Sequence, residues 1–529
     1  MGIESILWKI IQMMIKPAKI VIQWLYKKHK QWILGEEGCN APVSRFLRDK
    51  PFILMITFAA FWISMLFTPA LFAIILIPAV YGGFAIHRSR YKGSAEPLPS
   101  EFTACEFAEP RGVVFGKVGE NYFAKPETMD GHVMVIGGAG SGKSSCIAIP
   151  TLRVWKDRVF AIDIKGELYK NTSSFRANIK VMNPLDESTY GYDPYYLLKR
   201  SKNKAQEARA IAIAVIPKPE HTNDPFWVES AQNILTAAIL HCSYEDLTFA
   251  ETIKFVQKSS PAGLIESLVN SDYADVSLFV NSYIGIADKT LASIIAELSR
   301  NILVFATDHT LVSCLSRSKN ITPADLERGA DVYVQIPEHR LDQWENFLGL
   351  IVNQFLSYFE QRNEETAKPI LFMLDEFPRL GKIPKILSGL ATLRSKKITL
   401  CLILQSLAQL DSMYGNDKRK IISDTCAYKA ILRATDAETQ EYFSKLVGTY
   451  DKQVVSKGEQ RAAFTGIGTG TSTNQSEQER RIIKPEEFGT LKNIVLLSPF
   501  GHCRVEKVPY FAEESKSSSF SYIQSKTWG

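Results

Sequence analysis

The stretch Gly137-Gly138-Ala139-Gly140-Ser141-Gly142-Lys143-Ser144 decides the fold predicted for this chain. Its spacing, G-x-x-x-x-G-K-S, is that of a phosphate-binding loop, or P-loop. The apolar run His132–Ile136 before it predicts a buried strand, and Ser145–Leu152 after it predicts the start of a helix. Glycines let backbone N–H groups curve around phosphate oxygens, and a helix N-terminus adds positive potential. The alternative, a glycine-rich turn that matches by chance, does not explain the preceding strand.

The P-loop predicts ATP and Mg²⁺ as the cofactors of the chain. Lys143 is expected to reach the β- and γ-phosphates, and the hydroxyl of Ser144 is expected to ligate Mg²⁺. The predicted nucleotide-binding residues are Gly137, Gly138, Ala139, Gly140, Ser141, Gly142, Lys143, Ser144 and Ser145.

A second apolar run, Ile370–Leu374, ends in Asp375-Glu376, which is typical of a Walker B strand. Asp375 is predicted to hold Mg²⁺, together with Ser144. Glu376 is predicted to polarise the attacking water, because phosphoryl transfer needs an oriented nucleophile. The alternative is a strand that leads into a helix N-terminus, where acidic residues are favoured.

Two further residues are candidates for the catalytic site. Gln405 follows the apolar run Thr399–Leu404, and ligands of such sheets bind at the carboxyl ends of the strands. It is predicted to contact the γ-phosphate or the lytic water, although a loop-capping amide is the alternative. Arg394 lies between Asp375 and Gln405 and is predicted to act as an arginine finger on a neighbouring subunit's nucleotide. The alternative for Arg394 is a solvated helix end.

Length and composition indicate a folded protein of several domains. The chain has 529 residues, too many for one core, with 46% hydrophobic and 22% charged residues. Its formal net charge of +6 permits contact with nucleic acid or anionic lipid without demonstrating either. The eight cysteines form no C-x-x-C pair, which argues against a disulfide framework or a zinc site.

The N-terminal region predicts attachment to a membrane. Residues 1–50 contain nine Lys or Arg and four Asp or Glu, which favours a basic amphipathic segment at a membrane surface; an ordinary soluble helix is the alternative. Phe52–Ile86 contains no charged residue and is long enough for two short spans, residues 52–68 and 70–86. Basic residues flank both ends, so we expect a transmembrane hairpin over residues 51–92 with both termini in the cytoplasm.

The rest of the chain predicts an α/β domain with an inserted all-α domain. Short apolar runs alternate with helical stretches, which is typical of a doubly wound parallel sheet. The runs are His132–Ile136, Arg158–Ile162, Ile179–Met182, Val332–Ile336, Ile370–Leu374, Leu400–Leu404, Tyr428–Leu432 and Ile494–Leu497. Between Tyr195 and Asp308 only helices are expected, at Ala205–Val215, Val228–Leu240, Pro261–Val269 and Lys289–Thr307.

These patterns divide the chain after residue 92. The nucleotide-binding domain is expected at residues 93–194 and 311–512, the all-α domain at 195–310 and a flexible tail at 513–529. Gly112–Ala124 predicts a hairpin at the domain edge, and the polar segment Gln453–Arg480 predicts a mobile loop. The basic run Lys199, Arg200, Lys202 and Lys204 is either a solvated helix end or a DNA contact.

Motifs over about residues 90–510 resemble the coupling proteins of type IV secretion, the TraG-type conjugation ATPases related to the FtsK/HerA translocases. Besides the P-loop and the Walker B pair, they are Ile149-Pro150-Thr151-Leu152, Asp163-Ile164-Lys165-Gly166-Glu167, Asn183-Pro184-Leu185-Asp186, Phe226-Trp227, Leu380-Gly381 and Leu404–Leu410. The resemblance implies a RecA-like P-loop NTPase domain in a hexameric ring around a channel. It supports the roles given above to Lys143, Ser144, Asp375, Glu376, Arg394 and Gln405. Lys165 and Glu167 match a family segment without an assigned role.

The resemblance also implies partners and a location. The expected function is an ATPase of the bacterial inner membrane that delivers a relaxase–DNA complex or an effector protein to the type IV secretion channel. One alternative is a membrane receptor that recruits effector proteins and uses ATP as an assembly switch. A second alternative is a DNA translocase of the FtsK/HerA type.

Overall fold

The computed structural model describes residues 105–220, 224–365, 367–461, 468–499 and 501–512. These residues fall into two compact units. The larger unit comprises residues 106–446, 483–499 and 504–512, and the smaller one consists mainly of residues 447–461 and 468–482.

The larger unit is built on a central sheet in which its strands follow the order β15-β12-β4-β11-β10-β5-β9-β6. All eight predicted runs are strands of this sheet, and the strands from β12 to β6 are parallel. The prediction of parallel strands is wrong for β15, which runs antiparallel to β12. An apolar run gives no direction, because a short connection and a long crossover can follow the same sequence pattern.

The strands have the following bounds: β1 Cys105–Phe107, β2 Val113–Val118, β3 Asn121–Lys125, β4 Val133–Gly137, β5 Arg158–Asp163, β6 Ile179–Met182, β7 Gly191–Tyr192, β8 Asn320–Ile321, β9 Asp331–Gln335, β10 Ile370–Leu374, β11 Ile398–Leu404, β12 Tyr428–Arg433, β13 Thr449–Arg461, β14 Gly468–Arg481, β15 Ile494–Ser498 and β16 Gly501–Val505. The predicted hairpin at Gly112–Ala124 is confirmed by the antiparallel pair β2 and β3.

The helices have the following bounds: α5 Ile149–Val154, α6 Glu167–Thr172, α7 Lys204–Val215, α8 Phe226–Tyr244, α9 Phe249–Lys258, α10 Pro261–Val269, α11 Ala274–Ser277, α12 Asp288–Ile302, α13 Val304–Thr307, α14 His309–Leu315, α15 Pro323–Glu327, α16 Leu341–Glu360, α17 Ile386–Thr392, α18 Leu407–Tyr414, α19 Asn416–Thr425 and α20 Ala437–Val447.

Aromatic side chains fix helix α16 against the sheet. The ring of Phe160 on β5 lies 4.5 Å from that of Phe355 on α16 and 4.9 Å from that of Phe372 on β10. All three side chains are fully buried. Such close tilted ring pairs add about 0.5–1.5 kcal/mol each to the burial of apolar area. They hold β5 and β10, whose carboxyl ends carry the catalytic candidates, in one rigid layer.

Buried Arg176 ties the helix after the P-loop to the sheet. Its guanidinium pairs with Asp331 at the start of β9, with 2.6 Å between Nε and Oδ2. It also donates to the carbonyl oxygens of Leu152 and Trp155 at the end of α5, at 2.9 and 2.7 Å. Because a buried guanidinium needs both a counter-charge and hydrogen-bond acceptors, this site fixes where α5 ends.

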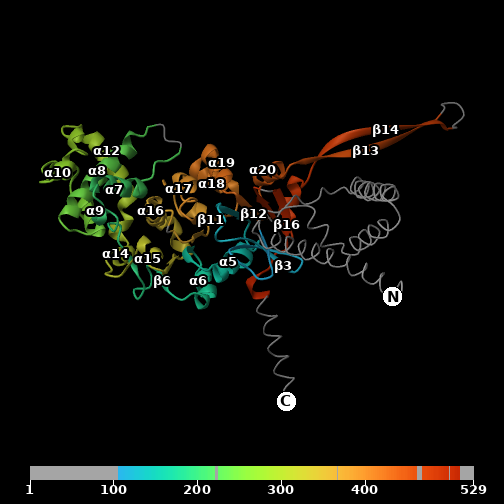
Figure 1. The fold of residues 1–529 in the computed structure, drawn as a ribbon. Helices are drawn as coiled ribbons and strands as arrows, with labels where there is room; N and C mark the ends of the chain where they lie inside the picture. Colours follow the sequence, from blue (N-terminus) through green and yellow to red (C-terminus); the bar gives the residue numbers. More distant parts are fainter. Residues whose placement is uncertain (1–104, 221–223, 366, 462–467, 500, 513–529) are drawn as a thin grey trace, which may run out of the picture. The chain divides into compact units, whose positions relative to one another are not determined.

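A group of helices, α7 to α14, lies at one end of the larger unit (Figure 1). Between β7 and β8 the described residues form helices and turns without a strand. Helix α8 is the centre of this group, with eleven buried residues. The predicted helices there are α7, α8, α10 and α12 with α13, whereas α9 and α14 have no counterpart among the predictions. Helix α9 begins at a capping box of Thr248 and Glu251, a signal that the sequence carries.

The polar segment Gln453–Arg480 is not a loop. Most of it forms the two long antiparallel strands β13 and β14, which pair from Thr449 with Arg481 to Arg461 with Gly468. The prediction of a mobile loop is therefore wrong for the described part of this segment. Strand pairing depends on backbone hydrogen bonds, which do not require an apolar alternation in the sequence.

The prediction of a multi-pass protein of the bacterial inner membrane is contradicted. None of the helices in the described ranges combines the length and the apolar character that crossing a bilayer requires. Helix α16 has twenty residues but carries Asp342 and Glu345, whereas a span needs about 20 predominantly apolar residues. The predicted amphipathic segment, residues 1–50, the predicted spans, 52–68 and 70–86, and the predicted tail, 513–529, lie outside the described residues.

Buried His132 connects three segments where the parallel strands begin. Its Nε2 lies 2.9 Å from the carbonyl oxygen of Leu390 on α17, and its Nδ1 accepts from the backbone N–H of Leu400, at 3.0 Å. Burial lowers the pKa of His132, the hydrogen bond to Leu390 opposes this, and the charges of Lys125 and Arg394 add to the lowering, so that the pKa is about 4. The imidazole is therefore neutral at pH 7, with its proton on Nε2.

Protonation of His132 should lower the free energy of unfolding in acid. The folded pKa is depressed below the unfolded value, so the neutral ring stabilises the fold above about pH 6.5 and this contribution is lost as pH falls toward 4. From pH 7 to 5 we expect a loss of roughly 2 kcal/mol of unfolding free energy from this group. Urea denaturation of His132→Gln should show a shallower pH dependence than wild type. Equal slopes in the two proteins would contradict this assignment.

Candidate functional site

The P-loop follows β4 and closes tightly on itself. Gly142 has φ +100°, a left-handed conformation that L side chains rarely adopt. A Cβ at Gly137 would lie 2.3 Å from Oγ of Ser141, so a larger residue there would force the Ser141 side chain to move. Ser144 and Ser145 follow at the start of a π-helix, Lys143–Ala148, which passes into α5. Pro150 has no N–H to donate to the carbonyl four residues earlier, which removes one α-helical bond at this junction.

Lys143 is buried at the base of the loop. Its ammonium donates to the carbonyl oxygen of Gly137, at 2.6 Å. Burial lowers its pKa, the nearby carboxylates of Glu376 and Asp375 oppose this, and the charge of Lys165 adds to it. A buried ammonium between backbone carbonyls and carboxylates is a site where phosphate oxygens are stabilised.

A second observation supports the binding of a polyphosphate by this loop. Oγ of Ser141 is buried and has no hydrogen-bond partner among the described residues. A buried hydroxyl without a partner costs about 1–3 kcal/mol, which a ligand with hydrogen-bonding oxygens recovers. Together with the backbone N–H groups of the loop and the ammonium of Lys143, this hydroxyl matches the chemistry of a nucleotide's phosphates.

Asp375 lies at the carboxyl end of β10 and is 7% exposed. Burial and, to a smaller extent, the neighbouring charge of Glu376 raise its pKa, Lys143 opposes the shift, and the resulting pKa is about 6. No group of three or more His, Cys, Asp or Glu that could hold a metal is found in the described ranges. Mg²⁺ in P-loop sites takes one carboxylate, one hydroxyl, phosphate oxygens and waters, so the donors of Asp375 and Ser144 suit it.

Glu376 is held in an unusual backbone conformation. Its φ of 48° is left-handed, and such a conformation costs a non-glycine residue about 1–3 kcal/mol. Its Oε2 accepts a hydrogen bond from Nε2 of Gln405, at 3.0 Å. Gln405 follows β11, which lies between β10 and β4 in the sheet. The predicted pair of catalytic side chains is thus in direct contact at the edge where the P-loop lies.

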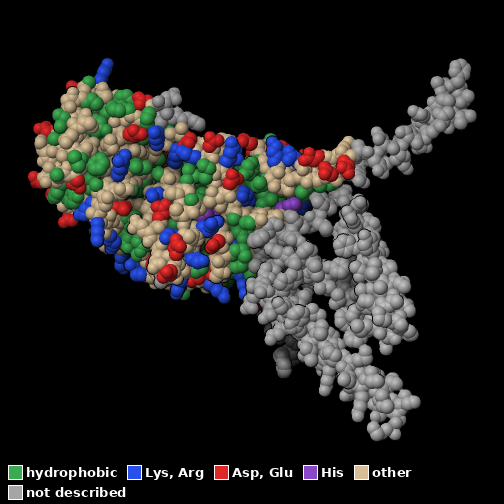
Figure 2. Space-filling model, turned by 45° about the horizontal axis from the view of Figure 1, so that its top comes forward, with side chains coloured by type: hydrophobic (Ala, Val, Ile, Leu, Met, Phe, Trp, Pro, Cys, Tyr) green, Lys and Arg blue, Asp and Glu red, His purple; other side chains and the backbone are tan. Residues whose placement is uncertain are grey.

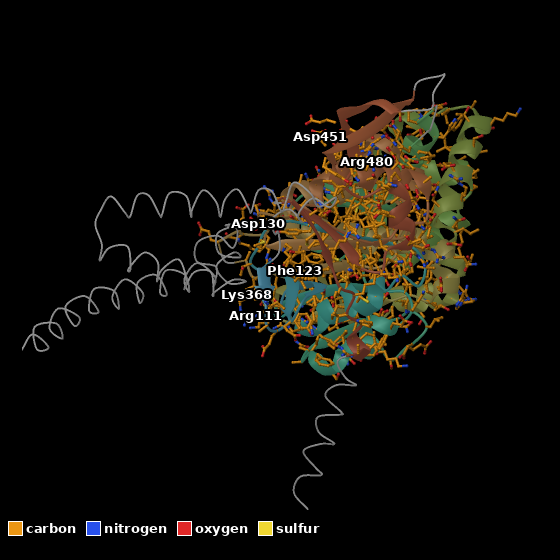
Figure 3. All side chains as sticks on the ribbon, turned by 90° about the vertical axis from the view of Figure 1, so that its right-hand side faces the viewer. Arg111, Phe123, Asp130, Lys368, Asp451 and Arg480 are labelled. Atoms are coloured by element: carbon orange, nitrogen blue, oxygen red, sulfur yellow. The ribbon has the colours of Figure 1, made fainter. Side chains whose placement is uncertain are left out.

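Arg394 lies at the opposite edge of the same sheet. It precedes β11, as Asp130 precedes β4 and Lys368 precedes β10, and Figure 3 shows Asp130 and Lys368 on one side of the structure. Its side chain is exposed. Because β11 has seven residues, about 23 Å separate this edge from the P-loop edge. Arg394 therefore does not join the other site residues of its own chain.

Two residues at the P-loop edge, Asp163 and Arg433, join the predicted site residues. Asp163 ends β5 and is buried; its carboxylate accepts from the backbone N–H groups of Leu168 and Tyr169, at 3.2 and 2.8 Å. It thereby fixes the turn that carries exposed Lys165 and Glu167. Arg433 ends β12 and donates to the carbonyl oxygen of Ala139, at 2.9 Å. Arg433 directly follows the predicted strand Tyr428–Leu432, so the sequence does indicate that it lies at this edge.

A family model described as "Type IV secretory system Conjugative DNA transfer" matches residues 101–527. Among relatives, the chain is 24% identical to the protein VirD4 of Agrobacterium fabrum over 514 residues, 92% of this chain and 76% of that protein. It is 23% identical to the conjugal transfer protein TraG of Escherichia coli over 67% of this chain and 61% of that protein. Several curated relatives, including the VirD4 of Rhizobium radiobacter at 62%, are thus matched over less than two thirds of their length.

Solved structures share the fold. The bacterial conjugative coupling protein TrwBdeltaN70, in its unbound monoclinic form, superposes with a TM-score of 0.58 at 18% identity, over 71% of this chain and 84% of that one. The plasmid coupling protein TrwB in complex with the ATP analogue ADPNP gives 0.61 at 17% identity, over 79% and 95%. TrwB has also been solved with ADP and Mg²⁺, with a TM-score of 0.60 at 18% identity, over 76% and 89%. The likeness confirms the predicted P-loop NTPase fold with its large central sheet.

Proposed function

Because the chain belongs to the family of type IV secretory system proteins for conjugative DNA transfer, we propose that it is a coupling ATPase. It recruits a protein–DNA complex or a protein substrate and delivers it to a type IV secretion channel, and ATP hydrolysis in a hexameric ring drives the delivery. The observation that carries this proposal is the gathering of Lys143, Asp375, Glu376 and Gln405 at one sheet edge.

The residues divide the chemistry of hydrolysis among them. Lys143 and the loop N–H groups bind the β- and γ-phosphates. Ser144 and Asp375 would hold Mg²⁺, which would neutralise charge on the phosphates. Glu376 accepts a proton from the attacking water. Gln405 donates a hydrogen bond to the carboxylate of Glu376, at 3.0 Å, and so orients this carboxylate toward the attacking water.

Two ion pairs of Glu220 in the larger unit connect this site to the group of helices α7 to α14. Glu220, in the segment between α7 and α8, accepts from Lys382 and Lys418, each at 2.8 Å. Lys382 lies six positions after Glu376, and Lys418 lies thirteen after Gln405. The segments that leave both catalytic strands therefore bind one carboxylate of the helical group, which supports coupling of hydrolysis to movement of that group.

The charge on the surface suits passage of DNA through local contacts. Basic side chains are interspersed with acidic ones on the face that Figure 2 shows. The predicted basic run Lys199, Arg200, Lys202 and Lys204 precedes α7 and ends at its first residue, and the Arg200 guanidinium lies 3.8 Å from the ring centre of Tyr196. Cations beside aromatic rings contact both phosphates and bases of a single strand.

DNA-stimulated hydrolysis tests this proposal. The full-length protein should hydrolyse ATP several-fold faster with single- or double-stranded DNA than without it, and Lys143→Ala should hydrolyse ATP under neither condition. The rate should fall steeply as salt rises, because phosphate contacts release counterions. Hydrolysis that DNA leaves unchanged, together with DNA-independent binding of effector proteins, would instead favour a receptor that uses ATP as an assembly switch.

A further inference from the structure

An irregularity in the sheet brings Arg433 to the P-loop. Strands β12 and β4 pair in register from Tyr428 to Ile431, and the register then shifts so that Arg433 pairs with Gly137. A bulge of this kind gives the strand an extra residue and re-aims the side chains after it. Lys507 donates to the carbonyl oxygen of Leu432 inside the bulge, at 3.0 Å, and so stabilises the shifted register.

Both the backbone and the side chain of Arg433 hold the tip of the P-loop. Its carbonyl oxygen accepts from the backbone N–H of Gly138, at 3.0 Å. Its Nη2 donates to the carbonyl oxygen of Ala139, at 2.9 Å. A Cβ at Gly138 would lie 3.9 Å from its Nε. The peptide N–H of Gly138 and the carbonyl oxygen of Ala139 are thus both held by one residue of the neighbouring strand.

The guanidinium of Arg433 keeps unused hydrogen-bonding capacity beside the loop. Its buried Nε has no hydrogen-bond partner within the described part of the chain. Lys507 lies nearby: burial lowers its pKa, Cys146 opposes this, and the charge of Arg433 adds to the lowering. Two cations beside the loop create a positive potential that favours an anion.

We propose that Arg433 is a positioning residue for nucleotide binding. It fixes the carbonyl of Ala139 and so the curvature of the Gly137–Ser144 loop, and its charge adds to the potential that attracts the polyphosphate. The inference rests on the proposed ATP binding. Because the described hydrogen bonds of Arg433 to the loop go to Gly138 and Ala139, whereas Glu376 is oriented by Gln405, Arg433 is expected to affect the affinity for nucleotide and not the chemical step.

Nucleotide affinity of Arg433 variants tests this inference. In the full-length protein, Arg433→Met should weaken binding of both ADP and ATP by roughly tenfold, because a lost charged hydrogen bond is of this size. Arg433→Lys should lose less, because it keeps the charge. At saturating ATP the turnover number should stay within about twofold of wild type. The matched control is Arg504→Met, since Arg504 is half-exposed and pairs with Glu487 at 3.4 Å.

The possible results separate this inference from the proposed function. A wild-type protein that binds neither ADP nor ATP would overturn the proposed ATPase itself. Wild-type affinity in Arg433→Met, or a loss of turnover at unchanged affinity, would overturn only the role of Arg433. A melting temperature of nucleotide-free Arg433→Met well below that of Arg504→Met, with no recovery in Arg433→Lys, would show a folding defect and would also overturn it.

Discussion

Arg394→Ala should lower the turnover number for ATP by at least about 10³-fold while ATP still binds nearly normally. An arginine supplied to a neighbour's nucleotide stabilises charge that develops in the transition state, and such fingers contribute about 10³–10⁵ in rate. The structure favours action between subunits, because Arg394 lies at the sheet edge opposite its own P-loop and its side chain is exposed. Arg394→Lys should recover little, because an ammonium lacks the planar fork of a guanidinium.

Mixing experiments distinguish a finger from a surface residue. Arg394→Ala mixed with Glu376→Gln should regain some hydrolysis, because some interfaces then combine an intact Glu376 with an intact Arg394. Wild-type hydrolysis should also depend steeply on protein concentration, because a finger in the proposed ring would complete a site only after subunits assemble. The control is Arg300→Ala, an exposed arginine of α12 that pairs with Glu297 at 2.7 Å. Wild-type turnover of assembled Arg394→Ala would show that Arg394 has no role in catalysis.

Glu376→Gln should lower ATP hydrolysis by about 10²- to 10⁴-fold, the usual contribution of a general base. The amide keeps the size and shape of the side chain and leaves an oxygen that can accept from Gln405, but it cannot take a proton from water. Binding of ATP should remain close to wild type. Gln405→Ala should lower turnover less, because it removes the donor that orients Glu376 without removing the base.

The control for Glu376 removes a glutamate charge elsewhere. Glu297→Gln, on α12, breaks an ion pair with Arg300 and should hydrolyse ATP at the wild-type rate. If Glu376→Gln turned over at the wild-type rate with ATP bound, the base would have to be another group, and the contact with Gln405 would be structural.

Local signals in the sequence were sufficient to predict the parallel strands of the central sheet. Each carries a run of apolar residues, because helices pack on both faces of a parallel sheet. This sequence pattern can therefore be recognised without knowledge of distant contacts. The same holds for Gly140 and Gly142 of the P-loop, whose φ angles of +68° and +100° disfavour other residues. The antiparallel direction of β15 and the pairing of β13 with β14 had no such local signal.

The sequence by itself determined the nucleotide chemistry of this protein. The spacing around Lys143 and the position of Asp375 and Glu376 after an apolar run are local, because a strand, a tight turn and a helix start are each specified by neighbouring residues. Tertiary structure alone decided which distant residues meet. Gln405 bonds to Glu376 because β11 was placed beside β10, and Arg433 reaches Ala139 because a bulge in β12 lies beside β4. Arg394 is separated from the same site because the parallel strands put residues that precede and follow β11 at opposite edges, a consequence of strand direction that short-range sequence patterns do not contain.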